Sequence, residues 1–85
     1  MNKRHQQTLD KIFQSPAATA LEWRDTEALF LALGAKTIEG RGARVRSELS
    51  GVMATFYRPH PTKEAKPYQV CDTHRFLEQA GIKKP

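Results

Sequence analysis

The strongest constraint on the fold is an alternating segment that is followed by a turn and a second run of strand-forming residues. In residues 44–49, Val45 and Leu49 share one face of an extended chain, and charged side chains alternate with them on the other. The pair Ser50-Gly51 is typical of a tight hairpin turn, and residues 52–57 form the returning run. The sequence therefore predicts an antiparallel hairpin with one buried and one polar face.

Helical patterns occur on both sides of this hairpin. Within residues 3–14 the apolar side chains recur at spacings of three and four, which places them on one helical face. Residues 26–33 are strong helix formers that follow Asp25, an expected N-cap, and end at a glycine. A last helix is expected through residues 76–80, with Asp72 as its cap.

A short segment, residues 36–39, is a candidate third strand, and Gly40-Arg41-Gly42 is the turn that joins it to the hairpin. The predicted order is helix, helix, three strands, helix. This order indicates an α+β fold in which one face of a three-stranded antiparallel sheet is covered by helices. A chain of 85 residues suits a single domain, with residues 1–20 as an N-terminal helical extension and residues 21–82 as the core.

The positive charge is concentrated in the middle of the chain. The net charge is +5, and residues 36–66 contain seven Lys and Arg against three Glu, which accounts for +4 of it. Such a cluster favours a polyanion or an acidic protein surface as the partner. The alternative interpretation is a solvated basic surface that keeps the protein soluble.

Cysteine content and hydropathy limit the classes of protein to which the chain can belong. Cys71 is the single cysteine, so no internal disulfide or thiolate zinc site can form, and we expect this thiol to be buried. The sequence shows no secretory signal and no apolar run near 18 residues. We therefore expect a cytoplasmic protein that does not associate with a membrane.

The sequence predicts neither a metal site nor a cofactor. The aspartates are scattered, the histidines lack the spacing of metal ligands, and no glycine-rich phosphate loop is present. Cleavage of RNA without a metal remains possible, because RNA carries its own nucleophile in the 2′-hydroxyl group. Such a reaction needs a general acid or base and cations that stabilise the phosphorane.

The proline-rich loop at residues 58–66 provides a candidate for this chemistry. His60 is the candidate general acid or base, because histidine titrates near neutrality. The alternative is that His60 merely packs between two prolines. Tyr57 and Tyr68 could stack on bases or be partly buried sheet residues. The cations expected to bind phosphate are Arg41, Arg44, Arg46, Arg58, Lys63 and Lys66, although the first three could equally form an exposed charged face.

Four segments, taken in order, resemble the HicA family of type II toxin–antitoxin systems, in the branch with an extra N-terminal helix. They are Leu21-Glu22-Trp23-Arg24-Asp25-Thr26-Glu27-Ala28-Leu29, Glu39-Gly40-Arg41-Gly42-Ala43-Arg44-Val45-Arg46, Arg58-Pro59-His60-Pro61 with Lys63-Glu64-Ala65-Lys66-Pro67-Tyr68-Gln69-Val70, and Phe76-Leu77-Glu78-Gln79-Ala80-Gly81. The resemblance covers nearly the whole chain. It implies an mRNA interferase, a metal-independent endoribonuclease, on a fold like the double-stranded-RNA-binding domain. It also implies a HicB-like antitoxin as partner, with DNA contacted only through the antitoxin complex.

One departure from the family concerns the expected catalytic histidine. Typical members carry a Gly-Ser-His-His run on the middle strand, where this chain has Gly42-Ala43-Arg44-Val45. The later Pro-His element of the family is matched by Pro59-His60. The resemblance therefore leaves His60 as the candidate for the acid–base step. The alternatives are an RNA-binding module that does not cleave, and an interaction protein whose basic face docks an acidic partner.

Overall fold

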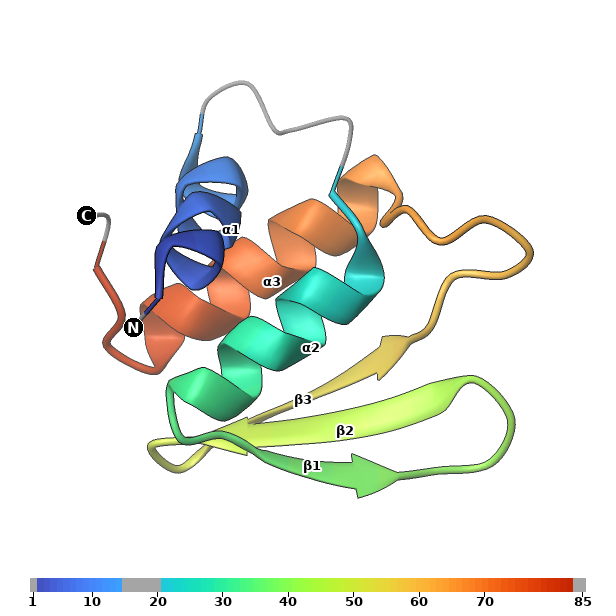
Figure 1. Ribbon diagram of the computed structural model, residues 1–85. Coiled ribbons are helices and arrows are strands. Elements are labelled where there is room, and N and C mark those ends of the chain that lie inside the picture. Colours follow the sequence, from blue (N-terminus) through green and yellow to red (C-terminus); the bar gives the residue numbers. More distant parts are fainter. Residues whose placement is uncertain (1, 15–20, 84–85) are drawn as a thin grey trace.

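The computed structural model describes residues 2–14 and 21–83, and it contains three helices and a three-stranded antiparallel sheet (Figure 1). Their order agrees with the α+β fold predicted from the sequence. The elements are α1 (Lys3–Phe13), α2 (Trp23–Ala32), β1 (Lys36–Glu39), β2 (Arg44–Leu49), β3 (Val52–Tyr57) and α3 (Pro67–Gln79).

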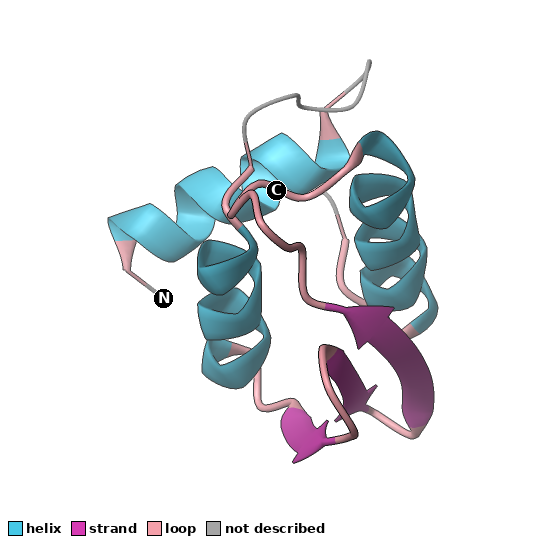
Figure 2. Cartoon of the chain, turned by 90° about the vertical axis from the view of Figure 1, so that its right-hand side faces the viewer, coloured by secondary structure: helices cyan, strands magenta, loops and turns pink. Residues whose placement is uncertain are grey.

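The sheet has the order β1-β2-β3, and the helices lie on one side of it (Figures 1 and 2). Val45 on β2 lies opposite Glu39 on β1 and Phe56 on β3. Ser50 and Gly51 both have positive φ, 51° and 80°, so the predicted hairpin turn is confirmed. Every second residue of β2 is buried, and the residues between them face away from the helices.

The centre of the core is an aromatic cluster that joins three elements. Phe30 of α2 lies 5.7 Å from Phe56 of β3 and 5.2 Å from Phe76 of α3, measured between ring centroids. Phe56 and Phe76 are themselves 5.7 Å apart. Trp23 adds a fourth ring, 5.4 Å from Phe56. These contacts hold α2 and α3 against the inner face of the sheet.

Helix α1 packs into the same core. Its predicted apolar face is confirmed, because Leu9, Ile12 and Phe13 are all buried. Arg4 of α1 also pairs with Asp25 of α2 at 3.0 Å. None of the helices in residues 2–14 and 21–83 is long and apolar enough to cross a membrane.

Two predicted helix starts are wrong. Helix α2 begins at Trp23, so Asp25 lies inside its first turn rather than at its cap. Helix α3 begins at Pro67, and Asp72 lies in its middle. Proline favours the first helical position because its φ is already helical and its missing N–H needs no partner there. Cys71 lies in α3 and is exposed, so the expected burial of this thiol is wrong.

Truncation of Phe30 tests the aromatic cluster. Phe30 is fully buried, so we expect Phe30→Ala to lower the free energy of unfolding by about 3–5 kcal/mol. Urea denaturation followed by circular dichroism measures this change. Leu31→Ala is the matched control in the same helix, because Leu31 is 59% exposed and its truncation leaves no cavity. Equal losses in the two variants would contradict the proposed core.

Candidate nucleic-acid interface

The loop that contains His60 is held by backbone hydrogen bonds on both sides. On one side, the Arg58 N–H donates to the Ala43 carbonyl at 2.8 Å. On the other, the Trp23 N–H donates to the Lys63 carbonyl at 3.0 Å, and the Ala65 N–H donates to the Leu21 carbonyl at 2.8 Å. Residues 59–62 therefore project between two fixed points.

Gln69 of α3 closes this loop with one side chain. Its Nε2 donates to the Tyr57 carbonyl at 2.6 Å, and its Oε1 accepts from the Lys66 N–H at 2.9 Å. Gln69 is only 4% exposed, so these bonds are protected from water. No local pattern in the sequence indicates this role, because the two groups that Gln69 binds come together only once α3 has packed on β3.

Arg58 lies between two carboxylates from different elements. Its Nε and Nη2 donate to Glu27 of α2 at 2.8 and 3.3 Å. Its Nη1 and Nη2 donate to Glu39 at the end of β1, at 2.7 and 2.8 Å. The Trp23 indole N–H also donates to Glu27, at 2.7 Å. The hydrogen bonds that Arg58 donates to Glu39 and Glu27 raise the pKa of Arg58, and the same bonding to Arg58 lowers the pKa of Glu39.

This pairing bears on the predicted phosphate contact of Arg58. A guanidinium has five N–H donors, and four of them are used in these bonds. A phosphate would have to displace one of the carboxylates to bind Arg58 strongly. The structure thus assigns Arg58 an anchoring role at the start of the loop. Sequence reasoning missed Glu27 and Glu39 because they lie 31 and 19 residues away in the chain.

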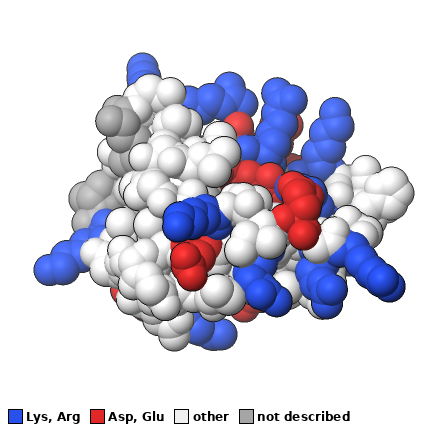
Figure 3. Space-filling model, turned by 90° about the horizontal axis from the view of Figure 1, so that it is seen from below, with Lys and Arg blue, Asp and Glu red and all other residues white. Residues whose placement is uncertain are grey.

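The other predicted phosphate ligands are exposed, and none forms an ion pair within residues 2–14 and 21–83. They are Arg41, Arg44, Arg46, Lys63 and Lys66. Arg41 lies in the β1–β2 turn, and the two lysines lie in or beside the His60 loop, at the same end of the molecule (Figure 1). Arg44 and Arg46 lie on the open face of the sheet. Figure 3 views this face from below and shows Lys and Arg gathered over its right half.

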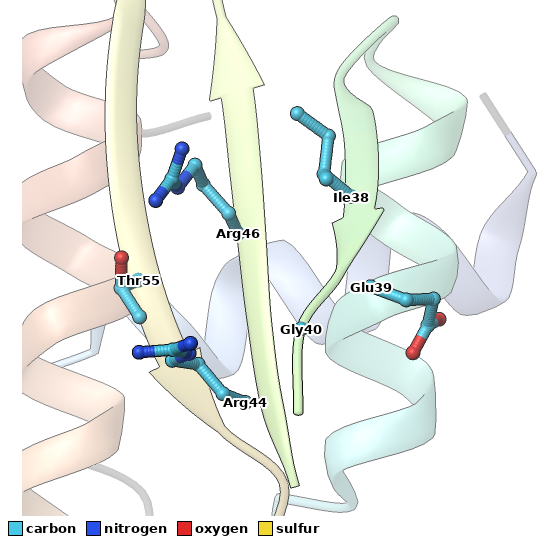
Figure 4. A pocket seen from close by; sticks show the side chains of 6 residues that line it. All are labelled: Ile38, Glu39, Gly40, Arg44, Arg46 and Thr55. Atoms are coloured by element: carbon cyan, nitrogen blue, oxygen red, sulfur yellow. The ribbon is translucent and has the colours of Figure 1, made fainter. Parts of the chain in front are cut away.

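Arg44 and Arg46 border a shallow depression on the open face, with a volume of about 190 Å³. Both side chains extend from β2 toward β3 and Thr55, whereas Glu39 points away from them (Figure 4). Gly40 lies close beside Arg44, because a Cβ at Gly40 would be 3.1 Å from the Arg44 Nε. Glycine at position 40 therefore leaves room for the Arg44 side chain, which a larger residue would crowd.

The three histidines lie in different environments. His60 is exposed, and the described part of the chain offers it no hydrogen-bond or ion-pair partner. His74 is half-buried in α3, where its ring centroid is 4.4 Å from that of Phe13 and its Nε2 is 3.4 Å from Glu78. His5 lies in the first turns of α1. His60 is thus the histidine that lies beside the exposed cations of the loop.

The two tyrosines differ from the expectation of partly buried sheet residues. Tyr57 ends β3 and is 57% exposed, and Tyr68 lies in α3 and is 58% exposed. Tyr57 lies opposite Arg44 in the β2–β3 register. Because side chains alternate along a strand, Tyr57 shares the open face with Thr55, whereas Phe56 enters the core.

Comparisons of this chain with known proteins identify no relative: no family model, no curated protein and no solved structure matches it. The function must therefore be argued from the arrangement of the residues. Within residues 2–14 and 21–83, no three His, Cys, Asp or Glu side chains come together in a group that could hold a metal ion. Of the residues that the sequence predicted for chemistry at this surface, His60 and the exposed cations remain free to act.

The bond between Arg58 and Glu39 predicts a loss of stability in acid. The lowered pKa of Glu39 means that its contribution is complete above the unfolded-state pKa of about 4.3, and is lost as the pH falls through the folded-state value. We expect Glu39→Gln to be less stable than the wild type at about pH 7, with the difference vanishing in stronger acid. Urea midpoints across this pH range provide the measurement.

Glu64→Gln is the control for this effect. Glu64 is also exposed, and it forms no ion pair with the described residues. Its variant should follow the wild type at every pH. A Glu39→Gln protein as stable as the wild type at neutral pH would show that the ion pair does not stabilise the fold.

Proposed function

We propose that this protein is a metal-independent endoribonuclease that acts on mRNA, as the toxin of a type II toxin–antitoxin pair. The observation that carries the proposal is an anchored loop that presents His60 beside cations without carboxylate partners. Support also comes from the order α2-β1-β2-β3-α3, which is the helix–three strands–helix order of a double-stranded-RNA-binding domain. The resemblance of the sequence to the HicA family adds the toxin role.

The chemistry follows from RNA itself. The 2′-oxygen attacks the adjacent phosphorus and loses its proton, the bond from phosphorus to the 5′-oxygen breaks, and that oxygen gains a proton. The products are a 2′,3′-cyclic phosphate and a 5′-hydroxyl. His60 transfers one of these protons and solvent water transfers the other, and the neighbouring cations stabilise the charge that develops on the phosphate oxygens. A protein that supplies these two functions needs no covalent intermediate.

Inhibition of the proposed toxin requires a partner that covers the His60 loop and the exposed cations. In the proposed pair a HicB-like antitoxin would bury the His60 loop and compensate the exposed cations. The charge of the loop region suits an acidic contact surface on that partner. DNA would be contacted only through the antitoxin in the complex.

A second candidate is an RNA-binding module that does not cleave. Two observations favour it. Strand β2 carries Arg44 and Val45 where the family has histidine, and arginine is a poor general base because of its very high pKa. In addition, no described side chain orients His60. Binding without cleavage would require only the cations.

Substitution of His60 separates the two candidates. Induced expression of the wild type in bacteria should arrest growth and deplete mRNA, whereas His60→Ala should do neither. With purified protein in EDTA, we expect His60→Ala to cleave RNA at least about 100-fold more slowly, because acid–base catalysis contributes about 10²–10⁴-fold. Because His60 is exposed, we expect His60→Ala to keep the fold, and circular dichroism of the variant checks this.

His5→Ala is the matched control and should behave as the wild type. Growth arrest by both the His60 and the His5 variants would indicate that the arginines, and not His60, carry out the reaction. An absolute requirement for Mg²⁺ would contradict the proposed mechanism. RNA binding without cleavage by the wild type would support the second candidate.

The salt dependence of RNA binding tests the role of the exposed cations. Each phosphate contact on a single strand contributes about −0.7 to the slope of log K against log salt concentration. Arg44→Gln should therefore weaken binding and make this slope shallower by about 0.7. Arg75→Gln is the control, because Arg75 is exposed on α3 near Asp72 and is not part of the proposed surface. Binding by the wild type that is independent of salt would argue against phosphate recognition.

A further inference from the structure

We propose that the open face of the sheet binds the substrate as single-stranded RNA, with one phosphate held between Arg44 and Arg46 and a neighbouring base stacked on Tyr57. This inference rests on the proposed function and specifies which form of RNA it uses and where that RNA lies. It adds Tyr57 as a residue that selects unpaired bases.

The strand register places these side chains in two adjacent rows across the sheet. In one row Ile38, Arg46 and Thr55 lie opposite one another, and in the next Arg44 lies opposite Tyr57. Strand neighbours lie about 4.8 Å apart, so each row brings its side chains within reach of a single nucleotide. The face thus combines charged groups with an exposed aromatic ring.

The phosphate position is defined by the depression beside Thr55. Two guanidinium groups enter it from one strand, and the Thr55 hydroxyl can donate a further hydrogen bond. Guanidinium groups bind phosphate oxygens through paired N–H donors. Glu39 does not compete for them, because its carboxylate is bound to Arg58 and points away (Figure 4).

The exposed aromatic ring favours unpaired RNA over a duplex. Bases in a duplex stack on each other and are not accessible to a ring on a sheet, whereas single-stranded bases can be splayed out onto aromatic side chains. Tyr57 is 57% exposed and stands at the end of β3, next to Arg44. An arginine beside an aromatic ring is the combination that single-strand surfaces use.

The same face is not suited to a protein partner that brings no carboxylates to it. The core of a protein interface is depleted in charge, and a charge buried there without a partner is costly. Arg44 and Arg46 lie in the middle strand, so a protein covering this face would have to bury both of them. A phosphate neutralises them directly.

The open face also leads to the proposed reaction centre. Tyr57 is the last residue of β3, and His60 follows three residues later. Three residues span at most about 11 Å, so a chain stacked on Tyr57 is within a few nucleotides of His60. The sheet face and the loop can therefore act on one continuous RNA strand.

Fluorescence anisotropy with a labelled 2′-O-methyl RNA tests the proposal without cleavage, because the nucleophilic hydroxyl is blocked. An oligonucleotide of about 12 nucleotides lies within the ~4–16 nucleotides that single-strand surfaces occupy. We expect Tyr57→Ala to bind about tenfold more weakly and Tyr57→Phe to bind within about twofold of the wild type, because stacking needs the ring and not the hydroxyl. A duplex of the same sequence should bind more weakly than the single strand.

Tyr68→Ala is the matched control, because Tyr68 is equally exposed but lies on α3. Unchanged affinity in Tyr57→Ala, or tighter binding of the duplex, would overturn the proposal. Weaker binding of Tyr68→Ala alone would place the RNA on the helical side. A wild-type protein that binds no RNA in about 50 mM salt would also overturn it and favour an acidic protein as the occupant of the face.

The outcomes separate this inference from the proposed nuclease function. RNA binding that depends on Tyr57, with no cleavage of unmodified RNA, would support RNA binding on the open face and contradict the nuclease function. Cleavage that depends on His60, with Tyr57→Ala binding RNA as tightly as the wild type, would contradict RNA binding on the open face and support the nuclease function.

Discussion

The organisation of the candidate site depends on the guanidinium of Arg58, which lies between Glu27 and Glu39. Through these two carboxylates Arg58 connects the start of the loop with α2 and with the end of β1. The indole of Trp23 binds the same Glu27, which links the pair to the aromatic core. Removal of the guanidinium would leave two carboxylates close together, so the three elements would lose a contact and gain a repulsion. These two ion pairs, together with the bond from the Arg58 N–H to the Ala43 carbonyl, therefore hold the start of the His60 loop.

This use of carboxylates also explains why Arg44 and Arg46 on the open face of the sheet keep their positive charge uncompensated. The acidic side chains that form ion pairs in the described residues are bound to cations outside the proposed surface or to Arg58 itself. Arg44 and Arg46 receive none of them. Their charges remain available to a ligand, and their solvent exposure keeps the cost of leaving them unpaired low. A fold that compensates its structural cations and leaves the others exposed separates stability from binding.

Much of the fold could be predicted because its signals are local. Alternation along β2, the turn at Ser50 and the apolar face of α1 are each defined within a few residues, and the outward position of Arg44 and Arg46 follows from the same alternation. The predicted start of α3 is wrong because a proline is compatible with a loop and also with a first helical turn, and in this chain Pro67 begins the helix. The partners of Arg58 and Gln69 could not be predicted, since they meet only after α2 and α3 pack on the sheet.

The sheet and the His60 loop contribute different parts of the proposed reaction, namely RNA binding and proton transfer. RNA supplies its own nucleophile, so a small protein has to place only a titratable group and positive charge near one phosphate. Gln69 ties both ends of the loop and Arg58 fixes its start, which restricts where His60 can lie although its side chain is exposed. The sheet contributes a rigid row of arginines and Tyr57 beside it. Anchoring the strand on the rigid sheet would bring its phosphates to the loop, so precision in the reaction would come from the scaffold and the substrate together.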